Sequence, residues 1–155
     1  MSVAFTLNGA AVAAPIEADA PLLAALRGAL GLSGPRYGCG AEQCGACLVL
    51  VDGAPAYACT LQAGAVEGLA VTTVEGLGTP EAPHPLQRAF LEFQAGQCGF
   101  CLSGILLRAA VLLRDNPHPT VEQVRLALDP HLCRCGSHNR IIRAVLAASE
   151  AMATT

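Results

Sequence analysis

The sequence predicts an α+β protein built in two parts, a strand-rich first part and a helical second part. Short apolar runs separated by glycine turns fill residues 1–76, and the pattern of apolar residues becomes helical from about residue 85 onward. Residues 77–84 between them are rich in glycine and proline, which is the composition of a linker. We therefore expect an α+β domain over 1–76, a linker over 77–84 and an all-α domain over 85–155.

The first part is expected to contain short strands joined by tight turns. Asn8-Gly9 follows an alternating apolar run and is a strong hairpin-turn signal. Asp52-Gly53 closes a second run that is continuously apolar, as in a buried strand. Strands are expected at Val3–Leu7, 11–16, 47–51, 55–59 and 69–74. Such strands with a single helix among them are typical of an α+β domain.

The helices are predicted from their caps and their periodicity. Asp19 is a candidate N-cap for the one helix of the first part, and Asn139 is a candidate N-cap for the last helix. Thr120 and Gln123 match a capping box at the start of another. The stretch 103–114 is apolar almost all round and should lie centrally. Helices are expected at 21–29, 86–93, 103–114, 121–128 and 140–152.

Composition excludes several classes of function. The chain has 155 residues and a net charge of −3, and it contains no run of basic residues, so nucleic-acid binding is not supported. The first residues show neither a positive n-region nor a long apolar core, so no signal peptide is expected. No uncharged apolar stretch is long enough to cross a membrane. We therefore expect a cytoplasmic protein.

Eight cysteines are the main chemical feature of the chain, and they form two groups of four. The first group is Cys39, Cys44, Cys47 and Cys59, and the second is Cys98, Cys101, Cys133 and Cys135. An even count is compatible with disulfides, but disulfide scaffolds are usually short secreted chains with few core residues. This chain shows no export signal and is 53% hydrophobic, so metal binding is favoured over disulfides.

The first group has the C-x4-C-x2-C…C spacing of plant-type [2Fe–2S] ferredoxins. Three thiolates on one short loop must converge on two adjacent irons, and Gly38, Gly40 and Gly45 are expected to supply the positive-φ freedom that such a bend requires. The fourth ligand, Cys59, is expected on the strand after the Asp52-Gly53 turn. A four-cysteine zinc site is the alternative, but zinc sites usually pair two C-x2-C units, so the spacing favours iron.

The second group combines C-x2-C with C-x-C, a spacing that is compatible with either iron or zinc. One pair stands just before the apolar helix, and the other pair stands just before the last helix. Helix N-termini present free N–H groups and a positive dipole end, which favour thiolates and an anionic cluster. Iron is the favoured interpretation, and zinc stays open.

Two longer motifs surround the second group, GQCGFC at 96–101 and LCRCG at 132–136. Following the ferredoxin-like group in this order, they resemble the small iron–sulfur subunit of the xanthine dehydrogenase family of molybdenum hydroxylases. The resemblance extends from Phe5 to about Ala148 and includes all eight cysteines. The run CRCGSH at 133–138 is further similar to the small subunits of isoquinoline oxidoreductase and nicotinate dehydrogenase.

The resemblance implies a β-grasp plant-type ferredoxin domain followed by a four-helix-bundle domain, each with one [2Fe–2S] cluster. It implies that the second cluster lies near a molybdopterin cofactor held mostly by a separate large subunit, and that Gln97 and Cys135 contact the pterin. The chain departs from the family at 102–104, where it has Leu-Ser-Gly in place of the usual Thr-Pro-Gly. Ser103 is expected to cap the helix there.

By the same resemblance, the partner's molybdenum site oxidises an N-heteroaromatic compound or an aldehyde. This chain would then carry the electrons one at a time from the second cluster to the first, with no catalytic residue of its own. The chain has no Gly-x-Gly-x-x-Gly signature, so a flavin subunit or a cytochrome is the expected acceptor. The alternative functions are a free-standing ferredoxin-like carrier and a zinc-stabilised interaction module. Periplasmic export as a folded complex is the alternative location.

Overall fold

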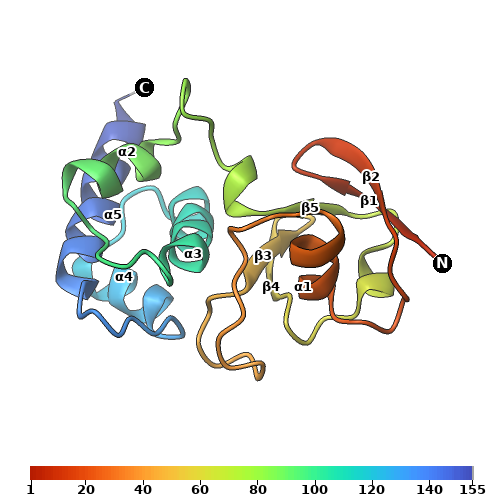
Figure 1. The fold of residues 1–155 in the computed structure, drawn as a ribbon. Coiled ribbons are helices and arrows are strands. Elements are labelled where there is room, and N and C mark those ends of the chain that lie inside the picture. Colours follow the sequence, from red (N-terminus) through yellow and green to blue (C-terminus); the bar gives the residue numbers. More distant parts are fainter. Residues whose placement is uncertain (155) are drawn as a thin grey trace.

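The computed structural model describes residues 1–154 and places a sheet-containing first part beside a helical second part (Figure 1). The strands are β1 (Val3–Leu7), β2 (Ala10–Ala14), β3 (Leu48–Val51), β4 (Ala54–Tyr57) and β5 (Ala70–Thr72). The helices are α1 (Leu22–Ala24), its π-helical continuation η1 (Ala25–Ala29), the 3₁₀ turns η2 (Ala63–Val66) and η3 (Val74–Gly76), α2 (Pro85–Glu92), α3 (Leu102–Asp115), α4 (Val121–Leu128) and α5 (His138–Ala153). The predicted α+β content is confirmed. Within residues 1–154, no helix has the length and apolar character needed to cross a membrane.

The strands form one sheet in the order β2-β1-β5-β3-β4. β1 and β2 pair antiparallel across the predicted hairpin turn, where Asn8 and Gly9 have positive φ angles of 50° and 86°. β3 pairs antiparallel with β4 and also with β5. β5 pairs parallel with β1. The strand β5 therefore joins the two hairpins into a single sheet.

The helix formed by α1 and η1 packs against this sheet, but it does not start as predicted (Figure 1). Asp19 is not its cap, because Pro21 holds the N-cap position and no side chain caps the first turn. The first N–H groups instead bond to main-chain oxygens of the segment after β4, for example from Leu22 to Leu61 at 2.7 Å. Neighbouring backbone thus satisfies the free donors of the helix start.

The helices α2 to α5 gather around an apolar core of their own. The predicted capping box of α4 is confirmed, since Thr120 Oγ accepts from Gln123 N at 3.2 Å and Gln123 Oε1 accepts from Thr120 N at 2.8 Å. The cap predicted at Asn139 is wrong, because α5 begins earlier and Ser137 holds the N-cap position. The Ser137 carbonyl already accepts the N–H of Ile141 at 3.0 Å, which places Asn139 inside the first turn.

Thr120→Ala is expected to lower the free energy of unfolding by about 1 kcal/mol, because the first turn of α4 loses its capping oxygen. Thr120→Ser keeps an oxygen in the same place and should stay near the wild type. Denaturant unfolding of the purified protein measures both variants. Equal stability of the alanine and serine variants would show that the capping box does not stabilise α4.

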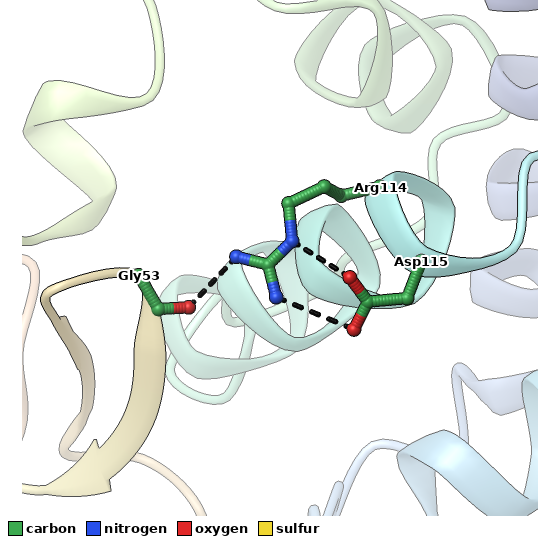
Figure 2. Close-up of polar contacts among 3 residues, drawn as sticks. All are labelled: Gly53, Arg114 and Asp115. Atoms are coloured by element: carbon green, nitrogen blue, oxygen red, sulfur yellow. Dashed lines mark hydrogen bonds and ion pairs between the residues drawn. The ribbon is translucent and has the colours of Figure 1, made fainter.

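The helix α3 lies between the two parts of the molecule. On one side its Leu107 packs into a small buried cluster with β3, and on the other side it packs against α2 and α4. At its C-terminal end, Arg114 donates to the Gly53 carbonyl of the β3–β4 turn at 2.8 Å, while Asp115 binds the same guanidinium (Figure 2). The sequence predicts that this apolar helix lies in the centre of the helical part, but it lies at the contact with the sheet and ties the two parts together.

Candidate metal centres

Three cysteines of the first group lie on the loop between η1 and β3, where backbone N–H groups point at their sulfurs. Cys39 Sγ accepts from the N–H groups of Ala41 at 3.3 Å and Gln43 at 3.2 Å. Cys44 Sγ in turn accepts from the N–H of Cys39 at 3.4 Å. Hydrogen bonds of this kind favour the thiolate over the thiol and stabilise the sulfurs of an anionic cluster.

The same loop follows the sharp course that the sequence predicts. Gly40 and Gly45 have φ angles of 67° and 76°, which side-chain-bearing residues rarely adopt. The positive φ predicted for Gly38 is wrong; a glycine is needed there because an added Cβ would overlap Cys44 Sγ. Glu42 is also left-handed, with a φ of 59°, and its carboxylate accepts a hydrogen bond from the Thr60 hydroxyl beside the fourth cysteine. The loop is thereby held against the turn that carries Cys59.

Cys59 approaches the loop from this turn and not from a strand, which corrects the prediction. The pairing of β3 with β4 ends at Tyr57, and the chain then turns so that Cys59 lies beside Cys47. Burial raises the pKa of the Cys47 thiol to about 12, and the nearby sulfurs of Cys59 and Cys44 add to the rise. By contrast, backbone N–H donors lower the pKa of the exposed Cys39 to about 7. A bound metal would replace the protons of all four thiols.

The second group lies where α3 and α5 begin. Its four thiols, two before each helix, are Cys98, Cys101, Cys133 and Cys135. Cys98 interacts with Cys135, and the Cys101 thiol interacts with that of Cys133. The two pairs are separated in the chain by the whole of α3 and α4, and these two interactions bring them together.

Burial raises the pKa of these thiols, whereas hydrogen bonds near the helix starts lower it. Burial raises the pKa of Cys101 to about 12, and Cys133 adds to the rise. The pKa of the exposed Cys98 is lowered, because the Phe100 N–H donates to its sulfur at 3.4 Å. Burial also opposes ionisation of Cys133, but hydrogen bonds from Ser137 and nearby backbone outweigh it and hold its pKa below the ordinary value. The start of α5 therefore favours a thiolate, as its position predicts.

The sequence also predicts roles for Ser103 and Gln97, which lie near this group. Ser103 does not cap α3, because the helix starts one residue earlier, with Cys101 at the N-cap position, and the buried Ser103 hydroxyl has no hydrogen-bond partner among residues 1–154. Gln97 is exposed, and its Nε2 donates to the Cys135 carbonyl at 3.5 Å. Gln97 also lines an open groove of about 890 Å³ beside α2 and α3. The structure thus places the two predicted pterin contacts side by side.

A direct backbone contact joins the two thiol groups, and the sequence did not predict it. The N–H of Leu132, next to the second group, donates to the carbonyl of Cys44 in the first group at 3.1 Å. The loop of the first group also packs closely against α3. A Cβ on Gly104 of α3 would overlap the Gly45 carbonyl oxygen, so only glycine allows this approach.

His131 is the residue of this junction that sequence reasoning missed. Its side chain is 1% exposed and lies against Gly45, where a Cβ would overlap the imidazole ring. Its Nε2 accepts from Arg108 Nε at 3.4 Å, and its carbonyl accepts from His138 Nε2 at 3.2 Å. Burial, aided by the charge of Arg108, lowers the pKa of His131 to about 4, so the ring is neutral at pH 7. Its position directly before the LCRCG motif was the sole signal.

The chemistry of both donor sets fits iron–sulfur clusters. Each set consists of thiols alone, the ligands that [2Fe–2S] clusters use. Backbone N–H groups point at the exposed sulfur of each set, Cys39 and Cys98. All eight cysteines are free thiols, so the disfavoured disulfide alternative gains no support. In the described part of the chain, no three His, Cys, Asp or Glu side chains lie as they would around a single metal ion.

Comparison with known families finds two iron–sulfur domains in the chain. Residues 5–69 match the family described as "2Fe-2S iron-sulfur cluster binding domain". Residues 73–146 match the family described as "[2Fe-2S] binding domain". Each match contains one of the two groups of four cysteines.

Known relatives match along nearly the whole chain. One subunit of the nicotinate dehydrogenase of Pseudomonas putida is 46% identical over 149 residues, which cover 96% of this chain and 95% of that protein. The alpha subunit of isoquinoline 1-oxidoreductase of Brevundimonas diminuta is 44% identical over 149 residues, covering 96% and 97%. The crystal structure of quinoline 2-oxidoreductase from Pseudomonas putida 86 matches with a TM-score of 0.93 and 38% identity, covering 99% of this chain and 96% of that one. The resemblance is thereby confirmed, and the chain belongs to the xanthine dehydrogenase family of molybdenum hydroxylases as a small [2Fe–2S] subunit.

Proposed function

We propose that this chain relays electrons from the molybdopterin cofactor of a large partner subunit to an external acceptor through two [2Fe–2S] clusters. The observation that supports this most directly is the pair of four-thiol groups joined by the bond from the Leu132 N–H to the Cys44 carbonyl. Clusters bound there would supply one-electron redox chemistry. The chain's own residues hold the ligands, keep water from the buried sulfurs and connect the two groups.

The eight cysteines are the proposed ligands. The first cluster is assigned to Cys39, Cys44, Cys47 and Cys59, and the second to Cys98, Cys101, Cys133 and Cys135. We assign the first cluster to a β-grasp domain over 1–76 and the second to a four-helix-bundle domain over 85–155, with a linker over 77–84. The two separate apolar cores, one within the sheet part and one among α2 to α5, support this division.

The second cluster is proposed to receive the electrons first. Gln97 lies against the Cys135 carbonyl and lines the open groove, so its amide is available to a pterin edge presented by the partner. Phe100, between Cys98 and Cys101, and Leu132, just before Cys133, are 47% and 64% exposed. Large apolar side chains exposed on both segments that carry this thiol group suit a surface that a partner covers.

The relatives support a substrate class for the partner's site. Nicotinate dehydrogenase, isoquinoline 1-oxidoreductase and quinoline 2-oxidoreductase are all named for N-heteroaromatic compounds. We therefore place an N-heteroaromatic substrate ahead of an aldehyde. A flavin subunit or a cytochrome is the proposed acceptor, because the chain has no dinucleotide-binding signature. The cytoplasm is the proposed compartment, because cysteines used as metal ligands and not in disulfides are typical of a reducing environment.

Anaerobic purification followed by metal analysis tests the proposal. The expected result is red-brown protein with about four iron atoms per chain, two for each [2Fe–2S] cluster. A large molybdenum-containing partner should co-purify. Colourless protein with one or two zinc ions would contradict the relay and support a zinc-stabilised interaction module. Iron-containing protein that purifies alone and serves several enzymes would support a free-standing carrier.

A further inference from the structure

We infer that Arg36 is a positioning residue that raises the reduction potential of the cluster at the second thiol group, an inference that rests on the proposed function. Arg36 belongs to the first part of the chain, shortly before Cys39, and its backbone N–H bonds to the Ala46 carbonyl at 2.9 Å. Its guanidinium nevertheless reaches the loop between Cys98 and Cys101. One side chain thus connects the backbone of one thiol loop to the other.

Three contacts hold the Arg36 side chain on that loop. Its Nη1 donates to the carbonyls of Gly99 at 2.6 Å and Phe100 at 3.0 Å. Its Cζ lies 5.5 Å from the centre of the Phe100 ring, in cation–π distance. Hydrogen bonds from a charged donor are shorter and stronger than neutral ones. The loop turns through Gly99 at a φ of 76°. It belongs to the helical part, but Arg36 of the sheet-containing part holds it in place.

A single peptide group links Arg36 to one of the thiols. The Gly99 carbonyl accepts from Arg36, and the N–H of the same peptide group is that of Phe100. This N–H donates to Cys98 Sγ at 3.4 Å. A charged donor on the carbonyl polarises the peptide group, and hydrogen bonds in such a chain strengthen one another. Arg36 therefore strengthens the N–H···S bond, which stabilises the more negative, reduced cluster and raises its potential.

Arg114 provides a matched control for the loss of a contact between the two parts. Its Nη1 also donates to a carbonyl across the interface, that of Gly53, at 2.8 Å (Figure 2). This contact is with the β3–β4 turn, at the opposite end of α3 from the second thiol group and roughly 18 Å along the helix axis. If only the loss of a contact between the two parts mattered, substitutions of Arg36 and Arg114 would have the same effect. A shift in the potential of the second cluster is expected for the Arg36 substitution alone.

The test is a redox titration of the assembled complex, with EPR spectra distinguishing the two clusters. Arg36→Met should make reduction of the second cluster about tenfold less favourable, a shift of ~59 mV for one electron, and should leave the first cluster unchanged. Arg36→Lys keeps the charge but loses the planar guanidinium, so its shift should be smaller. Arg114→Met should shift neither potential.

An unchanged second potential in Arg36→Met, or equal shifts of both clusters, overturns the inference. If Arg36→Met loses one or both clusters, Arg36→Lys decides, since a second potential equal to that of Arg114→Met overturns the inference and a lowered one supports it. A wild-type complex without a second [2Fe–2S] signal would instead contradict the proposed function, so the two failures are distinguishable.

Discussion

Cys135→Ser is expected to abolish reduction of both clusters by substrate while the spectrum of the first cluster is retained. Cys135 interacts with Cys98 in the second group and lies beside Gln97 at the proposed pterin contact, so its loss removes both a ligand and the entry point for electrons. The first group is held on a separate apolar core. Anaerobic mixing with substrate, followed by absorbance, measures the reduction, and EPR of dithionite-reduced protein reports which cluster persists.

Cys39→Ser is the matched control for the order of the relay. Cys39 is an exposed member of the first group, as Cys98 is of the second, and its loss should remove only the first cluster. Substrate should then still reduce the second cluster, while electrons no longer reach the external acceptor. Reduction of the first cluster at the wild-type rate in Cys135→Ser would contradict the assigned order.

Gly45→Ala is expected to destabilise the protein by roughly 2–5 kcal/mol and to lower occupancy of the first cluster. Gly45 has a φ of 76°, and an added Cβ would overlap the buried ring of His131. A left-handed backbone costs a side-chain-bearing residue about 1–2 kcal/mol, and overpacking of a well-packed site typically adds about 1–3 kcal/mol. Thermal unfolding measures the stability, and iron content per chain measures the occupancy.

Gly28→Ala is the matched control for this glycine substitution. Gly28 lies in η1, and an added Cβ there meets no atom within 4 Å. Because alanine is the better helix former, Gly28→Ala should be neutral or stabilising by up to about 1 kcal/mol. Equal stability of the Gly45 and Gly28 variants would show that the thiol loop is not packed tightly on His131.

The elements that were predicted correctly have signals contained in a few neighbouring residues. The Asn8-Gly9 turn needs only two residues that tolerate positive φ, and the capping box of α4 needs only Thr120 and Gln123. The cap predicted at Asp19 failed because the first helical residue there depends on contacts beyond the local pattern. At Asp19 the helix start is satisfied by backbone of a distant segment, which no local pattern reports.

The sequence by itself determined the α+β class, the two groups of four cysteines and the family, because spacing and motif order are properties of the chain. Only the tertiary structure decided how the two groups of cysteines lie relative to each other. It does so through the hydrogen bond from Leu132 to Cys44, the packing of His131 against Gly45 and the hydrogen bond from Arg36 to Gly99. These contacts join residues that are far apart in the chain. They form when two apolar cores pack on either side of α3, and which surfaces then meet depends on the shape of both cores.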